Sequence, residues 1–218
     1  MCLEKFLNRL HLFYLNLKSI RLPYFVPIAA IFAYIPSMLY LYYVTNKYSI
    51  VYVQSMTIME MQHIIPYFSI WWILFGVREY IEGSGKELLK VYKKSLIFDV
   101  ILTFIWYIMH TVLFILIISI FLKNNYFPDF LVLLSQCVFF SSAAFFMMTL
   151  FNTISIPFLI CTVYEIFFMY TNTDFASLMY KAKVESFTSI ILPYGLILIC
   201  SILLFFSAAY IYSKKHIK

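Results

Sequence analysis

Six apolar stretches of about 20 residues constrain the fold more than any other feature of this sequence. They cover residues 23–45, 56–77, 95–122, 129–151, 154–171 and 187–212. Only 12% of the 218 residues are charged, whereas soluble domains are about a quarter charged. Because a helix of that length matches the thickness of a bilayer, the sequence predicts an all-α membrane protein with six transmembrane helices.

The basic residues indicate how these helices are oriented. Twelve of the sixteen Lys and Arg residues lie before the first stretch, between the second and third, or after the sixth. Cytoplasmic loops are enriched in Lys and Arg, so we expect both termini to be cytoplasmic. The chain 1–218 would then be a single multi-pass domain of the cell membrane. The weakest boundary lies at 152–155, where fusion of the fourth and fifth stretches is the alternative.

Residues 2–20 show the pattern of an amphipathic helix that lies in the inner membrane interface. Apolar residues recur there at steps of three and four: Leu3, Phe6, Leu7, Leu10, Tyr14 and Leu17. Lys5 and Arg9 interrupt any continuous apolar segment, so we expect no cleaved signal peptide. A disordered basic tail is the alternative, which the regular spacing disfavours. Residues 171–186 are mildly amphipathic and are expected on the extracellular surface.

The segment 79–94 carries a helix-start signal between the second and third stretches. Ser84 and Glu87 have the spacing of a capping box, and Gly83 and Gly85 allow a sharp turn before it. The short helix would present an apolar patch and neighbouring charges, namely Leu88, Leu89 and Tyr92 with Glu79, Glu82 and Lys86. An apolar patch facing the cytosol predicts a lipid or protein partner.

The Gly-Ser-Gly-Lys sequence in this segment is not a nucleotide-binding loop. Tyr80 stands where the first glycine of that motif belongs, and Glu87 stands where the magnesium-binding hydroxyl belongs. A carboxylate at that position would repel phosphate. We therefore expect no nucleotide or other cofactor in this chain, and no nucleic-acid partner.

This layout resembles the permease subunits of ABC-2 type exporters. The local similarity rests on Glu79, Glu82, Gly83, Leu88-Leu89, Lys94-Ser95 and the closing residues 208–215. The resemblance implies that residues 2–20 form an elbow helix and that 79–94 form a coupling helix docked on a separate ATP-binding subunit. That subunit would hold ATP and magnesium. The resemblance also implies that two permease chains, identical or related, form the translocation pathway.

Four polar side chains inside the stretches are candidates for that pathway: Glu60, His63, His110 and Glu165. A charge at mid-span costs about 2.5–3.5 kcal/mol on insertion scales, so such residues are rare unless they serve a purpose. Glu60 is expected about 6 Å below the outer rim, with Glu165 at a similar depth. His63 lies one turn from Glu60 and can pair with it, and Pro66 can kink the helix.

Each candidate also has a structural interpretation. Glu60 and Glu165 can be wetted by water or headgroups near the interface, and His110 can be a neutral histidine bonded to a neighbouring helix. Asp99 is expected at the inner interface. We expect no catalytic residue and no metal site in this chain.

The leading functional hypothesis is a transport subunit that moves an amphipathic peptide, drug or lipid-like substrate while a partner hydrolyses ATP. The alternative is an intramembrane enzyme or a proton-coupled carrier that uses Glu60, His63 and Glu165. A metal-dependent protease needs a pattern such as H-E-x-x-H, which the sequence lacks. Many carriers contain an internal repeat, and none is obvious here.

Overall fold

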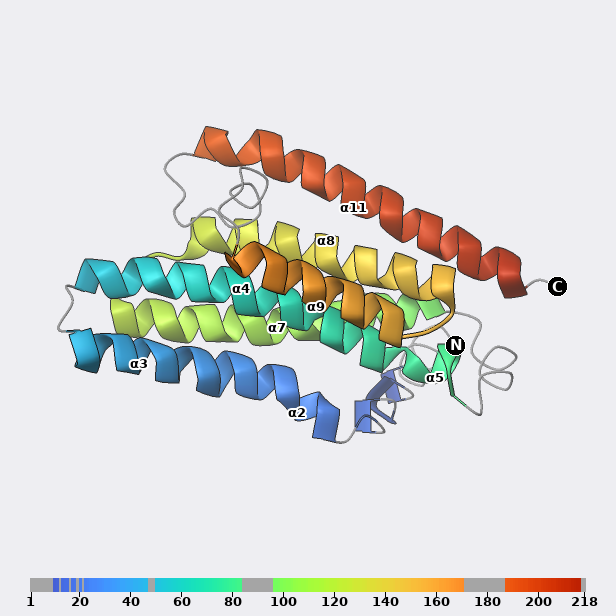
Figure 1. Ribbon diagram of the computed structural model, residues 1–218, viewed down its shortest axis with the longest axis horizontal. Helices are drawn as coiled ribbons and strands as arrows, with labels where there is room; N and C mark the ends of the chain where they lie inside the picture. Colours follow the sequence, from blue (N-terminus) through green and yellow to red (C-terminus); the bar gives the residue numbers. More distant parts are fainter. Residues whose placement is uncertain are drawn as a thin grey trace.

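The computed structural model describes residues 22–46, 50–83, 96–170 and 187–216, together with 10–20 except 12, 16 and 19. Within these ranges the protein contains helices and no strand. Figure 1 shows the long helices lying side by side with alternating direction. The first helix begins and the last helix ends at the same end of the bundle (Figure 1).

The first long segment contains a π-helical section between two α-helices: α2 (Leu22–Ala29), η1 (Ala30–Tyr34) and α3 (Ile35–Asn46). In a regular α-helix the ring of Pro36 would meet the carbonyl of the residue four positions earlier. The amide of Ile35 donates to the carbonyl of Ala30, which widens the helix ahead of the proline. The segment therefore continues without a break over the range predicted for the first span.

The remaining long helices match the other apolar stretches one to one. They are α4 (Ile50–Gly76), α7 (Leu96–Leu122), α8 (Phe127–Phe151), α9 (Ser155–Tyr170) and α11 (Phe187–His216), with the short α5 (Arg78–Ile81) after α4. Helix α4 begins six residues before the predicted span at 56. The other long helices begin and end within four residues of the predicted bounds.

Helices α8 and α9 are separate, so the alternative of one fused helix at 152–155 is wrong. Asn152 has a φ angle of 56°, in the left-handed region that ends helices, and its amide donates to the Met148 carbonyl at 2.9 Å. Asparagine tolerates this conformation better than most residues because its short polar side chain can hydrogen-bond locally.

Four helical segments among the described residues are long and apolar enough to cross a membrane. They are Leu22–Val44, Leu96–Leu122, Phe127–Phe151 and Tyr194–Lys214. Helix α4 is as long as α7, but polar and ionisable side chains interrupt its apolar sequence. Helix α9 is apolar but short, since its 16 residues extend only about 24 Å. These lengths and compositions indicate a membrane-embedded protein.

The N-terminal segment is helical at its described positions between residues 10 and 20. Phe13 and Leu17 are buried, while Tyr14 is 60% exposed. The prediction that Tyr14 and Leu17 share a buried face is therefore confirmed for Leu17 and wrong for Tyr14, because the buried side of the helix includes Phe13 in place of Tyr14. The other residues assigned to the predicted apolar face, apart from Leu10, lie outside the described residues.

Helices α4 and α8 form the centre of the bundle. The segment α2–α3 packs on α4, α7 packs mainly on α4, and α9 packs on both central helices. Helix α11 packs on α8 and lies at the edge of the bundle (Figure 1).

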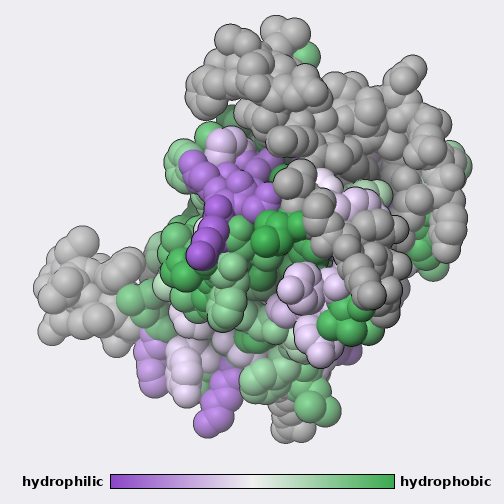
Figure 2. Space-filling model, turned by 90° about the vertical axis from the view of Figure 1, so that its left-hand side faces the viewer, coloured by the Kyte–Doolittle hydropathy of each residue, from purple (hydrophilic) through white to green (hydrophobic). Residues whose placement is uncertain are grey.

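Seen from the end at which α7 ends and α8 begins, the surface of the protein shows groups of hydrophilic residues next to hydrophobic ones (Figure 2). Lys123 and Asn125 of that connection are exposed.

Small residues bring α8 and α11 together. Ala144 of α8 and Ala208 of α11 are both fully buried in the same hydrophobic cluster. Alanines at a helix interface let the two backbones approach closely, and this contributes much of the packing energy between helices in a membrane.

We expect Ala208→Leu to reduce the free energy of unfolding by about 1–3 kcal/mol, because the added carbons overpack this interface. Ser207→Leu is the matched control, since Ser207 is exposed on the same helix. The thermal unfolding midpoint of the purified protein in detergent measures the effect. Equal midpoints for the two variants would contradict the close packing of α8 and α11.

Candidate functional site

A row of polar pairs joins α4 to α9. Nδ1 of His63 lies 3.2 Å from Oε1 of Glu165. One turn later on α4 and one turn earlier on α9, the hydroxyl of Tyr67 lies 2.9 Å from Oγ1 of Thr162. Because the two helices run in opposite directions, positions that ascend along α4 meet positions that descend along α9. The polar faces of the two helices are therefore turned toward each other.

The first of these pairs is shielded from the surroundings of the bundle. The side chain of Glu165 is 8% exposed and that of His63 is 13% exposed. Cys161, one turn before Glu165, is buried as well. An isolated carboxylate is costly in an apolar interior unless a charge or a hydrogen-bond donor faces it. The imidazole of His63 provides that partner.

Glu60 lies one turn before His63 on α4 and bonds to a different helix. The hydroxyl of Tyr42, on α3, donates to Oε1 of Glu60 at 3.0 Å. The sequence analysis predicts a local pair between Glu60 and His63, whereas these hydrogen bonds lead outward from α4 to α3 and α9. Two of the four pathway candidates therefore lie one turn apart on α4, and their bonds to Tyr42 and Glu165 link α4 to α3 and α9.

The fourth candidate, His110, lies in α7 and has a packing role. Its Nδ1 is 2.9 Å from the carbonyl of Trp106 in the same helix. Its ring makes edge contacts with Trp72 and Trp106, at centroid distances of 5.2 and 5.1 Å. The prediction of a bond to a neighbouring helix is wrong for this nitrogen, because the preceding turn of α7 supplies the acceptor.

A second group of contacts fastens the connection after α4. Tyr80 of α5 is buried and donates a hydrogen bond to Oδ2 of Asp99, near the start of α7. Burial, and then the bond to Asp99, raise the pKa of Tyr80, so its hydroxyl stays protonated and remains a donor. Asp99 itself is only 2% exposed. It is therefore a buried link between α5 and α7, a partnership that the sequence analysis missed.

Glu82, the second residue of this group, reaches the turn between α8 and α9. Its Oε1 accepts a hydrogen bond from Oγ1 of Thr153 and one from the amide of Ile154, both at 2.8 Å. The carboxylate thus binds backbone and side chain just before α9 begins, where a negative charge also suits the helix dipole. Sequence separation concealed this contact, since the two segments are 71 positions apart.

Gly83 follows at a place where the chain approaches itself. A Cβ atom at this position would lie 2.5 Å from the carbonyl oxygen of Glu79, which is closer than real contacts allow. The turn out of α5 thus requires glycine, in agreement with the predicted sharp turn. Glu79 itself is exposed on α5.

We expect Gly83→Ala to displace this turn and to reduce the free energy of unfolding by about 1–3 kcal/mol. Gly195→Ala is the control, because a Cβ atom there meets nothing within 4 Å and alanine favours a helix. The unfolding midpoint should fall for the first variant and stay level or rise for the second. An unchanged unfolding midpoint in Gly83→Ala would show that the turn can rearrange to accept the Cβ atom.

The rest of the predicted coupling helix lies outside the described residues: Ser84, Lys86, Glu87, Leu88, Leu89 and Tyr92. The extracellular segment predicted for 171–186 lies outside them as well. In the described part of the chain, no three His, Cys, Asp or Glu side chains gather as metal ligands would.

Polar spacing was the signal that could have revealed the pairs between α4 and α9. His63, Tyr67 and Trp71 recur every four residues on one face of α4. Glu165, Thr162 and Phe158 form a similar row on α9, and the rings of Trp71 and Phe158 meet at 5.5 Å. Two matched rows of this kind indicate facing helices.

No family model, curated protein or solved structure matches this chain.

Proposed function

We propose that this chain is the permease subunit of an ABC exporter of the ABC-2 type, with ATP hydrolysed by a separate subunit. One observation carries the proposal, namely that the connection after α4 is tied to two other parts of the bundle. Tyr80 bonds to Asp99 of α7, and Glu82 bonds to the turn between α8 and α9. A force applied to residues 84–94 would reach α4, α7, α8 and α9 together.

This arrangement suits a membrane subunit whose conformational change is driven by a separate protein. A loop that merely joined two spans would need no buried tyrosine and no carboxylate fastening it to distant segments. Helix ends that move as one unit can transmit a displacement of the coupling helix into the membrane, as coupled access changes require. The exposed apolar patch expected at Leu88 and Leu89 would be the surface on which the ATPase docks.

In this proposal all six long helices cross the plasma membrane. Helix α4 contains ionisable side chains, but His63 contacts Glu165 of α9 and does not face lipid. Helix α9 begins near Glu82 and runs away from α5, so it ends toward the proposed outer side, where we expect residues 171–186. The first and last described helices have their free ends on the side of α5, and the basic residues assign that side to the cytoplasm (Figure 1).

The pathway proposed here runs along α4 and α9 and includes Glu60, His63 and Glu165. His63 is at the midpoint of α4, and Glu60 lies one turn nearer the end that is remote from α5. Because α4 begins at Ile50, Glu60 lies about 15 Å along the helix, and the predicted depth of about 6 Å is wrong. A cationic or amphipathic substrate would interact with the carboxylates there. Six helices form a thin bundle, so we propose two permease chains in the working unit, which would share the pathway.

A proton-coupled carrier is the second candidate, and the bond between His63 and Glu165 favours it. Both side chains are ionisable and largely buried, and they join two helices, as proton relays in membrane transporters do. The two functions differ in their energy source. A carrier works with a pH gradient and no nucleotide, whereas an ABC permease needs ATP and its partner.

The hydrogen bonds between Glu82 and the α8–α9 turn provide the test. We expect Glu82→Ala to lower ATP-driven transport in vesicles by about tenfold while the ATPase still co-purifies, because both hydrogen bonds to the α8–α9 turn are lost. Glu82→Gln keeps an accepting oxygen and should restore part of the activity. The ratio of substrate moved to ATP hydrolysed is measured for each variant.

Lys123→Asp changes a charge at the opposite end of the bundle and serves as the control. If the ratio of substrate moved to ATP hydrolysed is unchanged in Glu82→Ala, these hydrogen bonds do not couple ATP hydrolysis to transport. Transport that follows a pH gradient without ATP would favour the carrier in its place.

A further inference from the structure

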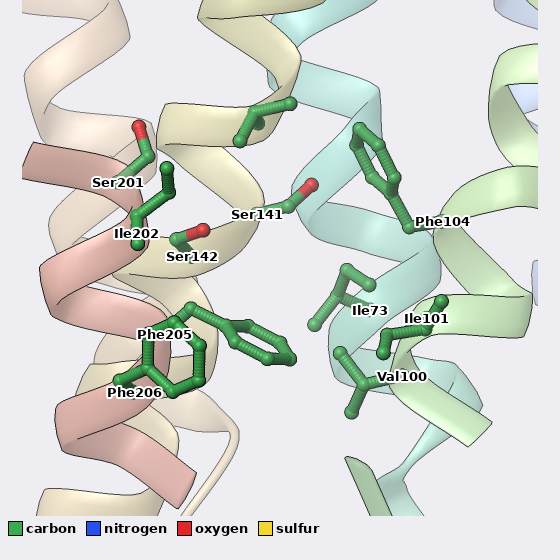
Figure 3. A pocket seen from close by; sticks show the side chains of 11 residues that line it. Ile73, Val100, Ile101, Phe104, Ser141, Ser142, Ser201, Ile202, Phe205 and Phe206 are labelled. Carbon is green, nitrogen blue, oxygen red and sulfur yellow. The ribbon is translucent and has the colours of Figure 1, made fainter. Parts of the chain in front are cut away.

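A pocket lies on the side of the bundle remote from α9. Helix α8 forms its floor, α4 and α7 form one wall, and α11 forms the other (Figure 3). Its volume is about 170 Å³, slightly more than that of an engineered apolar cavity of about 150 Å³ that binds benzene. The lining is apolar except for three serines, Ser141, Ser142 and Ser201.

Ser141 is the unusual residue of this lining. It is only 6% exposed, and its Oγ has no hydrogen-bond partner among the described residues. Figure 3 shows this oxygen pointing away from α8 into the space next to Phe104. A buried hydroxyl without a partner is unfavourable, and most buried polar groups in proteins are hydrogen-bonded.

Several other buried serines and threonines among the described residues donate to a carbonyl of their own helix. Ser201, in the opposite wall of the same pocket, donates to the carbonyl of Ile197 at 2.6 Å, and Thr103 donates to that of Asp99 at 2.7 Å. This is the usual solution for serine and threonine in helices. The hydroxyl of Ser141 points into the pocket and forms no such bond.

The pocket opens sideways between α7 and α11. Ile101 of α7 and Ile202 and Phe206 of α11 line its rim and are 43%, 52% and 66% exposed. Both helices belong to the four that are long and apolar enough to cross a membrane. In a bilayer this opening faces hydrocarbon, so an occupant must be apolar over most of its surface.

We propose that this pocket binds a small, largely apolar molecule that has one oxygen able to accept a hydrogen bond from Ser141. The molecule enters from the hydrocarbon layer between α7 and α11. Phe104, Phe205 and Phe206 provide aromatic contacts for its body, and Ser141 fixes its orientation. The site is separate from the polar row between α4 and α9, and it requires membrane embedding but not the proposed transport function.

Benzophenone is a suitable probe, because it has two apolar rings and one carbonyl and inserts into nearby C–H bonds under light. The full-length protein in phosphatidylcholine nanodiscs is titrated with benzophenone and irradiated, and the labelled residues are mapped by mass spectrometry. We expect saturable labelling around Phe104 and Phe205. Diphenylmethane, which lacks the carbonyl, should compete about tenfold less well than unreactive carbonyl analogues of similar shape.

Two variants and one control separate an effect on binding from an effect on folding. Ser141→Ala should raise the half-saturating concentration about tenfold, and Ser213→Ala, at an exposed position of α11, should not change it. Ile202→Trp adds bulk only at the exposed rim and should block labelling without disturbing the core.

Three results would overturn the proposal. The first is labelling that never saturates and falls equally on exposed α7 residues such as Leu113 and Leu116. The second is an unchanged half-saturation in Ser141→Ala. The third is an unlabelled pocket together with rapid disulfide formation between two copies of Phe206→Cys, which would show that a second chain covers the opening.

Discussion

The variant His63→Leu is expected to lose about 3 kcal/mol of unfolding free energy, whereas His63→Leu combined with Glu165→Leu stays within about 1 kcal/mol of the wild type. The single change places a leucine opposite the 8% exposed carboxylate of Glu165. Removing one member of a buried pair leaves the other poorly compensated. Replacing both members by apolar groups removes that penalty and retains packing between α4 and α9.

The thermal unfolding midpoint in detergent measures both variants, with His11→Leu at an exposed position as the control. Transport by the double variant then separates two roles of the pair. If His63 and Glu165 face the pathway, the folded double variant should transport at least about tenfold less. Full transport by a stable double variant would show that the pair only holds the helices together, and a stable single variant would contradict the predicted penalty.

Changing both Leu88 and Leu89 to aspartate is expected to release the proposed ATP-binding partner almost completely. Two carboxylates in the centre of the proposed docking surface would have to be buried without partners, which is strongly unfavourable. The chain should still insert, because the changes lie between α4 and α7. Co-purification of the ATPase with the tagged permease from native membranes measures the loss.

The control for this prediction is the same charge placed where no docking is expected. Lys123→Asp lies in the connection between α7 and α8, at the other end of the bundle from α5. It should co-purify with the partner as the wild type does. An ATPase that stays bound to the double aspartate variant would place its docking surface elsewhere.

Helix positions could be predicted from the sequence because apolar length is a local property. Even the boundary at Asn152 followed from a short polar interruption between two apolar stretches. Helix α4 was harder, since its first turns contain Gln54 and Ser55 and therefore look like a loop. The structure extends the helix over them, and Gln54 bonds to the carbonyl of Leu122 at the end of α7.

The partners of the polar residues depend on how helices face one another, which no single stretch reveals. A local reading pairs Glu60 with His63 because they are one turn apart. The structure bonds Glu60 to Tyr42 and His63 to Glu165, and the latter residue is 102 positions away. The same limit applies to Glu82: the sequence assigns its carboxylate to a docking loop, whereas the structure bonds it to Thr153 and Ile154.

The composition of the complex released from membranes distinguishes the two proposed functions, and native mass spectrometry measures it. We expect a particle that contains two permease chains and two copies of an ATP-binding subunit. The aspartate changes at Leu88 and Leu89 should remove the ATP-binding subunits and leave the pair of permease chains. Detection of this chain without any nucleotide-binding protein, in a preparation that still moves substrate along a pH gradient, would rule out an ABC permease.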